Sequence, residues 1–140
     1  MTMGEKRPPR SLLNAQDRKF WELCGSGELH LQKCRSCGHI PWPVVEKCES
    51  CGAEQLEFEK MSGKGKLRSW CTFVQDYYRG GGMPVPYDTI VVELEEGPWF
   101  LSNPQGFATS DAAHGMDVKV SFLPCEDEHG EYNLPVFEKA

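Results

Sequence analysis

Long apolar runs are absent from this chain of 140 residues. None of its apolar stretches approaches the ~18–20 residues that a membrane-spanning helix requires. Residues 1–10 are polar and contain Pro8 and Pro9, without the apolar segment of a signal peptide. From these two absences we expect a cytoplasmic protein.

Motifs for catalysis and for nucleotide binding are absent as well. The sequence has no G-x-S-x-G elbow, no Walker loop, no dinucleotide fingerprint and no Cys–His pair at a recognised spacing. The run Gly63-Lys64-Gly65 is too short to cradle a phosphate and predicts a tight bend before a strand. We therefore expect no turnover by this chain alone, and a free-standing acyltransferase or lyase is the function that the residues support least.

Positive charge is scarce in the carboxyl-terminal part. Residues 1–50 carry eight Lys and Arg against six Asp and Glu, whereas residues 51–140 carry seven against fifteen. The main basic run there is made by Lys60, Lys64, Lys66 and Arg68. A phosphate backbone would meet mostly repulsive charge in this part of the chain.

Seven cysteines are present, and four of them form two matched pairs. The pairs stand in Cys34-Arg35-Ser36-Cys37-Gly38 and Cys48-Glu49-Ser50-Cys51-Gly52, which give the spacing C-x2-C-x10-C-x2-C. In such a C-x-x-C-G turn, called a knuckle below, backbone N–H groups can point at thiolate sulfurs while the glycine adopts a positive φ. The odd total of cysteines argues against a disulfide scaffold. The spacing predicts one zinc site with Cys34, Cys37, Cys48 and Cys51 as its ligands.

Four thiolates would close the coordination shell, so the predicted metal is structural and not catalytic. Iron fits the same four sulfurs, which leaves rubredoxin-like electron transfer as an alternative. The other cysteines, Cys24, Cys71 and Cys125, have no partner at ligand spacing, and we expect them in the core. His39, two residues beyond the first knuckle, is expected beside the metal shell or on the surface.

Periodicity predicts one helix before the first knuckle. Asn14 or Ser11 can cap a helix whose apolar residues lie between Leu12 and Leu23, and residues 1–10 are expected to form a flexible arm. Apolar residues alternate in the segment 28–42 on both sides of the first knuckle. This alternation predicts a β-hairpin with the knuckle at its tip.

Five further strands are predicted from alternation, and together they indicate a small barrel. They cover Lys66–Val74, Thr89–Leu94, Trp99–Leu101, Asp117–Leu123 and Leu134–Phe137. Val118, Val120 and Phe122 should face the core of this barrel, because they alternate with polar residues. Trp70 and Trp99 are also expected in the core.

The order of these parts resembles a known family. The segments that carry the resemblance are Phe20-Trp21-Glu22, Gly27–Gly38, Pro43, Cys48, Cys51, Ser62–Leu67, Pro86-Tyr87, Ile90–Gly97, Gly115–Val120 and Leu134–Phe137. They are similar to the zinc-ribbon plus OB-fold acyl-CoA-associated family, formerly catalogued as domain of unknown function 35, over about residues 12–138. The family commonly has a second Pro and an Arg after the position of Pro43, where this chain has Val44-Val45.

The resemblance implies a mainly β protein in three segments. Residues 1–27 would form an N-terminal arm and helix, residues 28–56 a rubredoxin-like zinc ribbon, and residues 57–140 a five-stranded OB-fold barrel. It also implies an accessory role, because such proteins pair with thiolase-like enzymes, aldolases of that fold or hot-dog-fold hydratases, and the partner usually holds the catalytic residues. We therefore expect a non-catalytic zinc-binding subunit of a hetero-oligomer that helps to form a channel for acyl-CoA or a related acyl substrate.

Nine residues are candidates for contact with the partner or the substrate. They are Phe20, Trp21, Trp42, Lys64, Lys66, Arg68, Tyr77, Tyr78 and Tyr87. The aromatic members can anchor an interface, and the last three flank or end the Gly- and Pro-rich residues 79–87, which predict a long loop between two strands. The basic members could instead meet the phosphates of coenzyme A. The alternative function is nucleic-acid binding, because zinc ribbons and OB barrels both bind nucleic acids.

Overall fold

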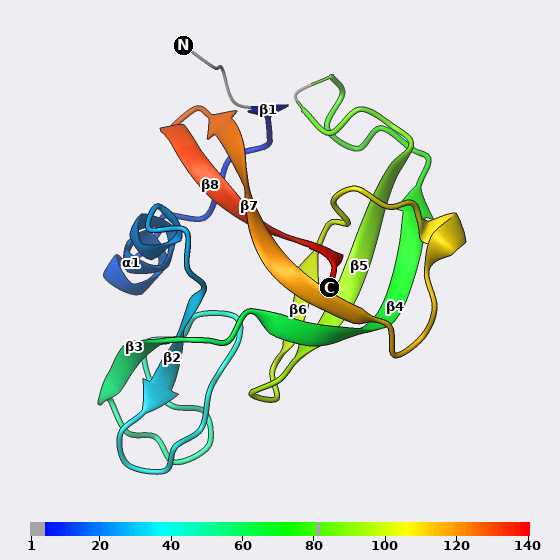
Figure 1. Ribbon diagram of the computed structural model, residues 1–140. Helices are drawn as coiled ribbons and strands as arrows, with labels where there is room; N and C mark the ends of the chain where they lie inside the picture. Colours follow the sequence, from blue (N-terminus) through cyan, green and yellow to red (C-terminus); the bar gives the residue numbers. More distant parts are fainter. Residues whose placement is uncertain (1–4, 81) are drawn as a thin grey trace.

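The computed structural model describes residues 5–80 and 82–140, and these form two sheets and one α-helix. Figure 1 shows the smaller sheet at one end of the larger one, with the helix beside both. The mainly β architecture with a helix near the N-terminus is therefore confirmed. Among the described residues, no helix has the length and apolar character needed to cross a membrane.

Helix α1 spans Ala15–Cys24 and begins where the sequence predicts. The side chain of Asn14 caps it by accepting a hydrogen bond of 2.9 Å from the backbone N–H of Asp17. Phe20 and Cys24 are its buried residues, and the helix lies against strands β8 and β2. The helix is therefore held mainly by the apolar face that it buries, since ten residues alone are too few for a stable helix in water.

The smaller sheet pairs β2 (His30–Cys34) with β3 (Leu56–Lys60) in antiparallel fashion. The predicted hairpin within residues 28–42 is therefore wrong, because β2 pairs with a segment that follows the second knuckle. Pro41 and Pro43 explain the difference, since proline has no N–H to donate to a strand ladder. Strand β3 also crosses the predicted boundary between residues 56 and 57.

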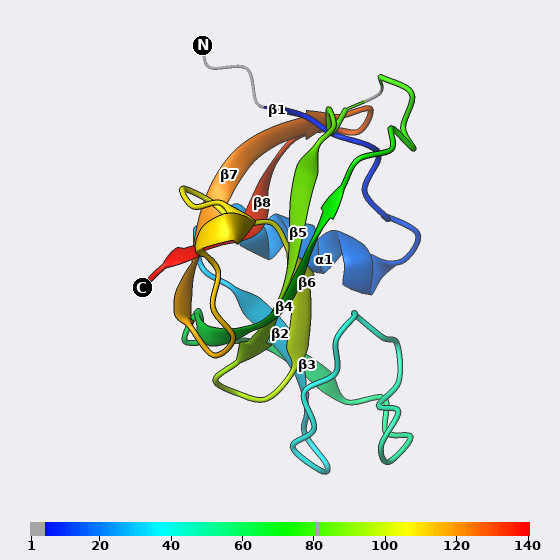
Figure 2. The ribbon, with the colours of Figure 1, turned by 90° about the vertical axis from the view of Figure 1, so that its right-hand side faces the viewer.

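The larger sheet contains the five barrel strands that alternation predicts. They are β4 (Lys64–Phe73), β5 (Tyr87–Leu94), β6 (Trp99–Ser102), β7 (Asp117–Asp127) and β8 (Gly130–Lys139). The strand order is β1-β7-β4-β5-β6, and β8 pairs with β7 along residues 118–127. An isolated bridge between Pro104 and Phe137 brings the end of β6 to β8, which closes the sheet into a barrel (Figure 2). A short 3-10 helix, Thr109–Asp111, and a long loop between β4 and β5 complete it.

One apolar core runs through both sheets. The ring of Trp42, from the segment between the knuckles, stacks on Phe100 of β6 with 4.5 Å between ring centroids, and it lies 4.8 Å from Phe20 of α1. Phe100 in turn contacts Phe137 of β8 edge to face. The ribbon, the helix and the barrel are thus packed against one another through aromatic side chains.

The strand faces agree with the predicted core except at β6. Val118 is buried, and Val120, Phe122 and Trp70 are partly buried against the core. The prediction for Trp99 is wrong, because 56% of this residue is exposed. Strand β6 has apolar side chains on both faces, and the inward position is taken by its neighbour Phe100.

Residues 5–10 are not a flexible arm, so that prediction is wrong for the part of the segment that the structure describes; residues 1–4 lie outside it. Strand β1 (Glu5–Lys6) pairs in parallel with β7. Arg10 then binds Asp127, with 2.7 Å between Nε and Oδ2, and the carboxylate is fully buried. The segment is ordered by a partner that lies 117 residues away in the sequence.

Candidate metal centre and neighbouring surfaces

The two knuckles have the same backbone geometry. In the first, the N–H of Gly38 donates to the carbonyl of Cys34, and in the second the N–H of Gly52 donates to the carbonyl of Cys48. The two glycines have φ values of 78° and 77°. Because this conformation is unfavourable for residues with a Cβ, the trailing glycine of each knuckle is a structural requirement.

The four knuckle cysteines come together. Their Sγ atoms all lie within 4.8 Å of one another, with 3.6 Å between Cys34 and Cys51 and 3.7 Å between Cys37 and Cys48. A tetrahedral ion with Zn–S distances of ~2.3 Å requires sulfurs about 3.8 Å apart. The residues present therefore fit a tetrahedral four-sulfur metal site.

Backbone N–H groups favour a thiolate in this cluster. The N–H groups of Cys37 and Ser36 point at the sulfur of Cys34 and lower its pKa from 9.0 to about 6. At Cys51 the N–H of Ala53 acts in the same direction, but hydrogen bonds with the neighbouring thiols outweigh it and raise the pKa to about 12. A bound cation would replace those thiol protons and relieve the crowding of charge.

Polar side chains fasten the ribbon around the cluster. Gln32 of β2 is 1% exposed, and its amide both donates to the carbonyl of Val45 at 2.8 Å and accepts from the N–H of Val45 at 2.9 Å. Arg35, between the first two cysteines, pairs with Glu57 and Glu59 of β3. Gln32 was not predicted, although a buried position in a strand that leads into a knuckle was the available signal. His39 lies on the surface beside Glu49, as expected.

The remaining cysteines are not all in the core. Cys24 and Cys125 are buried as predicted, and burial raises the pKa of Cys24 to about 12, which makes that thiol a poor nucleophile. The prediction for Cys71 is wrong, since it is exposed on β4. Among residues 5–80 and 82–140, no hydrogen bond joins a histidine to a cysteine or serine side chain. The described part of the chain thus offers no activated nucleophile of the Cys–His or Ser–His type.

The aromatic candidates lie in two groups. Phe20, Trp21 and Trp42 meet at the junction of helix, ribbon and barrel, and Phe20 is 3% exposed. Tyr77 and Tyr78 are exposed on the long loop after β4, and Tyr87 begins β5. A role of these residues in binding a partner stays a prediction.

The basic candidates lie along one wall of an open cleft of about 810 Å³ at the start of β4. Two of the three are already paired with acids of the same chain. Lys66 Nζ lies 2.7 Å from Asp117, and Arg68 Nη2 lies 2.6 Å from Glu93. This pairing removes most of the positive potential that a polyanion would need, which weakens the alternative of nucleic-acid binding.

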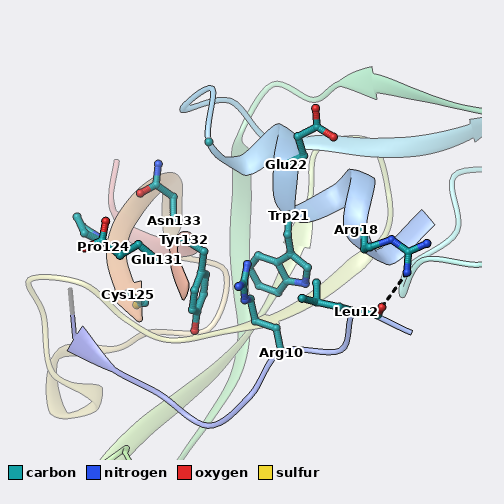
Figure 3. Close-up of a pocket in the computed structure, with 11 residues that line it drawn as sticks. Arg10, Leu12, Arg18, Trp21, Glu22, Pro124, Cys125, Glu131, Tyr132 and Asn133 are labelled. Carbon is teal, nitrogen blue, oxygen red and sulfur yellow. Dashed lines mark hydrogen bonds between the residues drawn. The ribbon is translucent and has the colours of Figure 1, made fainter. Parts of the chain in front are cut away.

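A second cleft, of about 560 Å³, lies between residue 10, α1 and the β7–β8 hairpin. Figure 3 shows Arg10, Trp21 and Tyr132 directed toward one another, whereas Arg18 points away and donates to the carbonyl of Leu12. The guanidinium of Arg10 lies 4.1 Å from the Tyr132 ring centroid and is engaged by Asp127. Arg10 therefore holds the N-terminal segment against the barrel through Asp127.

A rubredoxin-like zinc ribbon followed by an OB-fold barrel is the class of protein that this fold and its cysteine cluster define. The ChsH2 rubredoxin-like zinc ribbon domain matches residues 21–57, and the ChsH2 C-terminal OB-fold domain matches residues 58–123. The chain belongs to this ChsH2-type family, whose members include DUF35 scaffold proteins.

Individual relatives agree with this assignment. A DUF35 domain-containing scaffold protein of Pyrococcus furiosus is 34% identical over 63% of each chain. The benzoylsuccinyl-CoA thiolase subunit BbsA of Thauera aromatica is 32% identical over 69% of this chain and 56% of the relative. A chain of a solved Ltp2-ChsH2(DUF35) aldolase superposes with a TM-score of 0.78 at 25% identity, over 93% of this chain and 98% of that chain. The chain spans 40% to 63% of the length of the first curated relatives that it matches.

Proposed function

We propose that this chain is a non-catalytic, zinc-containing accessory subunit of a thiolase-like acyltransferase or aldolase that acts on acyl-CoA or a related acyl substrate. The observation that carries the proposal is the likeness to the DUF35 chain of the Ltp2-ChsH2 aldolase, which covers nearly all of both chains. The thiolase subunit BbsA supports the same class of partner. A cytoplasmic location is part of the proposal.

Zinc would be held by Cys34, Cys37, Cys48 and Cys51 and would stabilise the ribbon. With four protein sulfurs as ligands, no position is left for water or substrate, so the ion would take no part in catalysis. The chain's own contribution would be to present a fixed surface beside the active site of the partner and to help enclose the acyl chain. Elemental analysis should find about one zinc per chain, and iron with a visible charge-transfer band would instead favour electron transfer.

The test combines binding with activity. The chain and a thiolase-like or aldolase subunit from the same genome are expressed separately and together, and each is assayed on acyl-CoA substrates. We expect the two to copurify, the chain alone to be inactive, and the mixture to exceed the partner alone. Thioester chemistry by the chain alone at the rate of the mixture would overturn the proposal, and so would an active partner that never binds the chain.

A further inference from the structure

The outer surface of strands β4, β5 and β6 carries apolar side chains in register. Directly paired residues of antiparallel strands share a face. The pairing aligns Phe73 with Tyr87, and it aligns Val91 with Leu101. We define the outer sheet face by its apolar members Cys71, Phe73, Tyr87, Val91, Trp99 and Leu101; Ser69, Thr89 and Glu93 lie among them on the same face.

No described helix covers this face. Trp99 and Leu101 are 56% and 64% exposed, while Phe100 between them is buried. Helix α1 packs against β8 and β2, on the other side of the barrel (Figures 1 and 2). Contiguous exposed apolar residues on a soluble domain usually mark an interaction site, and tryptophan and tyrosine are enriched at the centres of interfaces.

Charge on the outer sheet face is cancelled within the chain. Arg68 at its edge is paired with Glu93 at 2.6 Å, and the other oxygen of Glu93 accepts a hydrogen bond of 3.2 Å from the indole of Trp99. The chain as a whole carries a net charge of −6, so this neutral face differs from the acidic character of the rest of the chain. An anionic lipid surface or a nucleic acid requires free cations, whereas an apolar and uncharged protein surface complements this face.

The size of the face argues against a second copy of this chain. Its four rows of paired residues extend about 20 Å along the strands, and its three strands extend about 10 Å across, which gives roughly 200 Å². A stable interface needs about 800 Å² from each partner. Two copies joined through this face would bury less area than a stable interface needs. A larger subunit can extend its contact onto the β4–β5 loop, where Val74 and Tyr77 are also exposed.

We propose that the outer sheet face is the docking surface for the enzyme subunit, with Trp99 and Leu101 of β6 as its most exposed large apolar members. The subunit offers an apolar, uncharged counter-surface to this face. The inference rests on the proposed function, because it takes the thiolase-like or aldolase subunit as the occupant.

Leu101→Glu tests the docking surface, because the side chain is exposed and the fold does not depend on it. The matched control is Leu13→Glu, the same change at a leucine that is 89% exposed and lies before α1. Binding to the thiolase-like or aldolase subunit from the same genome is measured by calorimetry. We expect Leu101→Glu to weaken binding by at least ~30-fold, the loss typical of a hot-spot residue, and Leu13→Glu to bind as the wild type does. Trp99→Gln should repeat the loss without adding a charge.

The possible results separate this inference from the proposed function. If the wild type binds and the two face variants bind equally well, the docking surface is wrong and the proposed function stands. If the wild type itself does not bind, the proposed function fails and the docking surface fails with it. Self-association of the wild type that Leu101→Glu abolishes, with unchanged affinity for the enzyme subunit, would assign the face to a second copy and overturn the inference.

Discussion

The ribbon and the barrel are stabilised in different ways. The ribbon sheet has two strands of five residues, and a two-stranded sheet is marginal in water. The barrel has five strands around a core that includes Leu67, Ile90 and Phe137, each 0% exposed. We infer that a metal at the four cysteines supplements the apolar contacts of the small ribbon, so the two regions should respond differently to the same perturbation.

Removal of the metal should give the largest difference in stability between the ribbon and the barrel. Structural zinc contributes about 10–16 kcal/mol of apparent binding free energy in small ribbons at neutral pH, which is more than such a module can lose and stay folded. Chelation, or Cys48→Ser, should therefore remove hydrogen-exchange protection from β2 and β3 while amides of β7 and β8 stay protected. Cys71→Ser, at an exposed cysteine outside the cluster, is the matched control and should leave the zinc content unchanged. Simultaneous loss of protection in both regions would show that they form one cooperative unit.

Phe100→Ala acts where the two regions meet. The buried ring stacks on Trp42 of the ribbon and contacts Phe137 of the barrel, so its removal should cost ~3–5 kcal/mol in urea unfolding and also weaken zinc retention. Val118→Ala removes two buried methyl groups from the barrel core and should cost ~2 kcal/mol without an effect on zinc retention. Equal effects of both variants on zinc retention, measured by competition with a chromophoric chelator, would contradict a specific coupling through Trp42.

Asp127→Asn should destabilise the barrel and leave the ribbon unaffected. Burial acts to raise the pKa of Asp127, but hydrogen bonds from Arg10 and from the N–H of His129 outweigh it and lower the pKa to about 2. The pair therefore contributes its full stability above pH ~4, and the contribution is lost as the pH falls toward 2. We expect a loss of about 2 kcal/mol at pH 7, a difference from the wild type that shrinks on the acid side, and unchanged zinc content. A difference that is constant with pH would contradict this account.

The smallest effect is expected at an ion pair on the surface of the barrel. Lys66 Nζ binds Asp117 Oδ1 at 2.7 Å, and this hydrogen bond lowers the pKa of Asp117, but both side chains are more than half exposed. Solvent and salt screen such a pair, so Asp117→Asn should give no resolvable change in the urea midpoint at 0.15 M salt. A shift comparable to that of Asp127→Asn would mean that exposure is a poor guide to the strength of these pairs.

The sequence predicted the parts of the molecule that depend on short-range patterns. The knuckles are readable because Cys34 and Cys37 carry their ligand spacing and glycine with them, and β7 is readable because one of its faces is buried. The pairing of β2 with β3 was missed, since the partner lies beyond the second knuckle. The outward direction of Trp99 was also missed, because a strand with apolar residues on both faces does not tell which face is inside.

Long-range polar contacts were not readable from the sequence either. Arg10 and Asp127 are separated by 117 residues, and a charged residue in a Pro-rich N-terminal stretch is more often solvated. The position of Gln32 in a strand that leads into a knuckle indicates burial, but the sequence does not identify the backbone of Val45 as its hydrogen-bond partner. The contact roles of the aromatic and basic candidates stay predictions, as do the boundaries of the three segments.

The passage from ribbon to barrel takes only three residues, 61–63, between β3 and β4. The N–H of Met61 donates to Leu29 of the ribbon at 2.7 Å, and the carbonyl of Gly63 accepts from Val120 of the barrel at 2.7 Å. A linker that is hydrogen-bonded at both ends is not a flexible tether, so it fixes the orientation of the ribbon relative to the barrel. A macromolecule that binds both the ribbon and the barrel finds them already at a fixed spacing. Binding therefore costs no additional entropy for fixing the orientation of one module relative to the other.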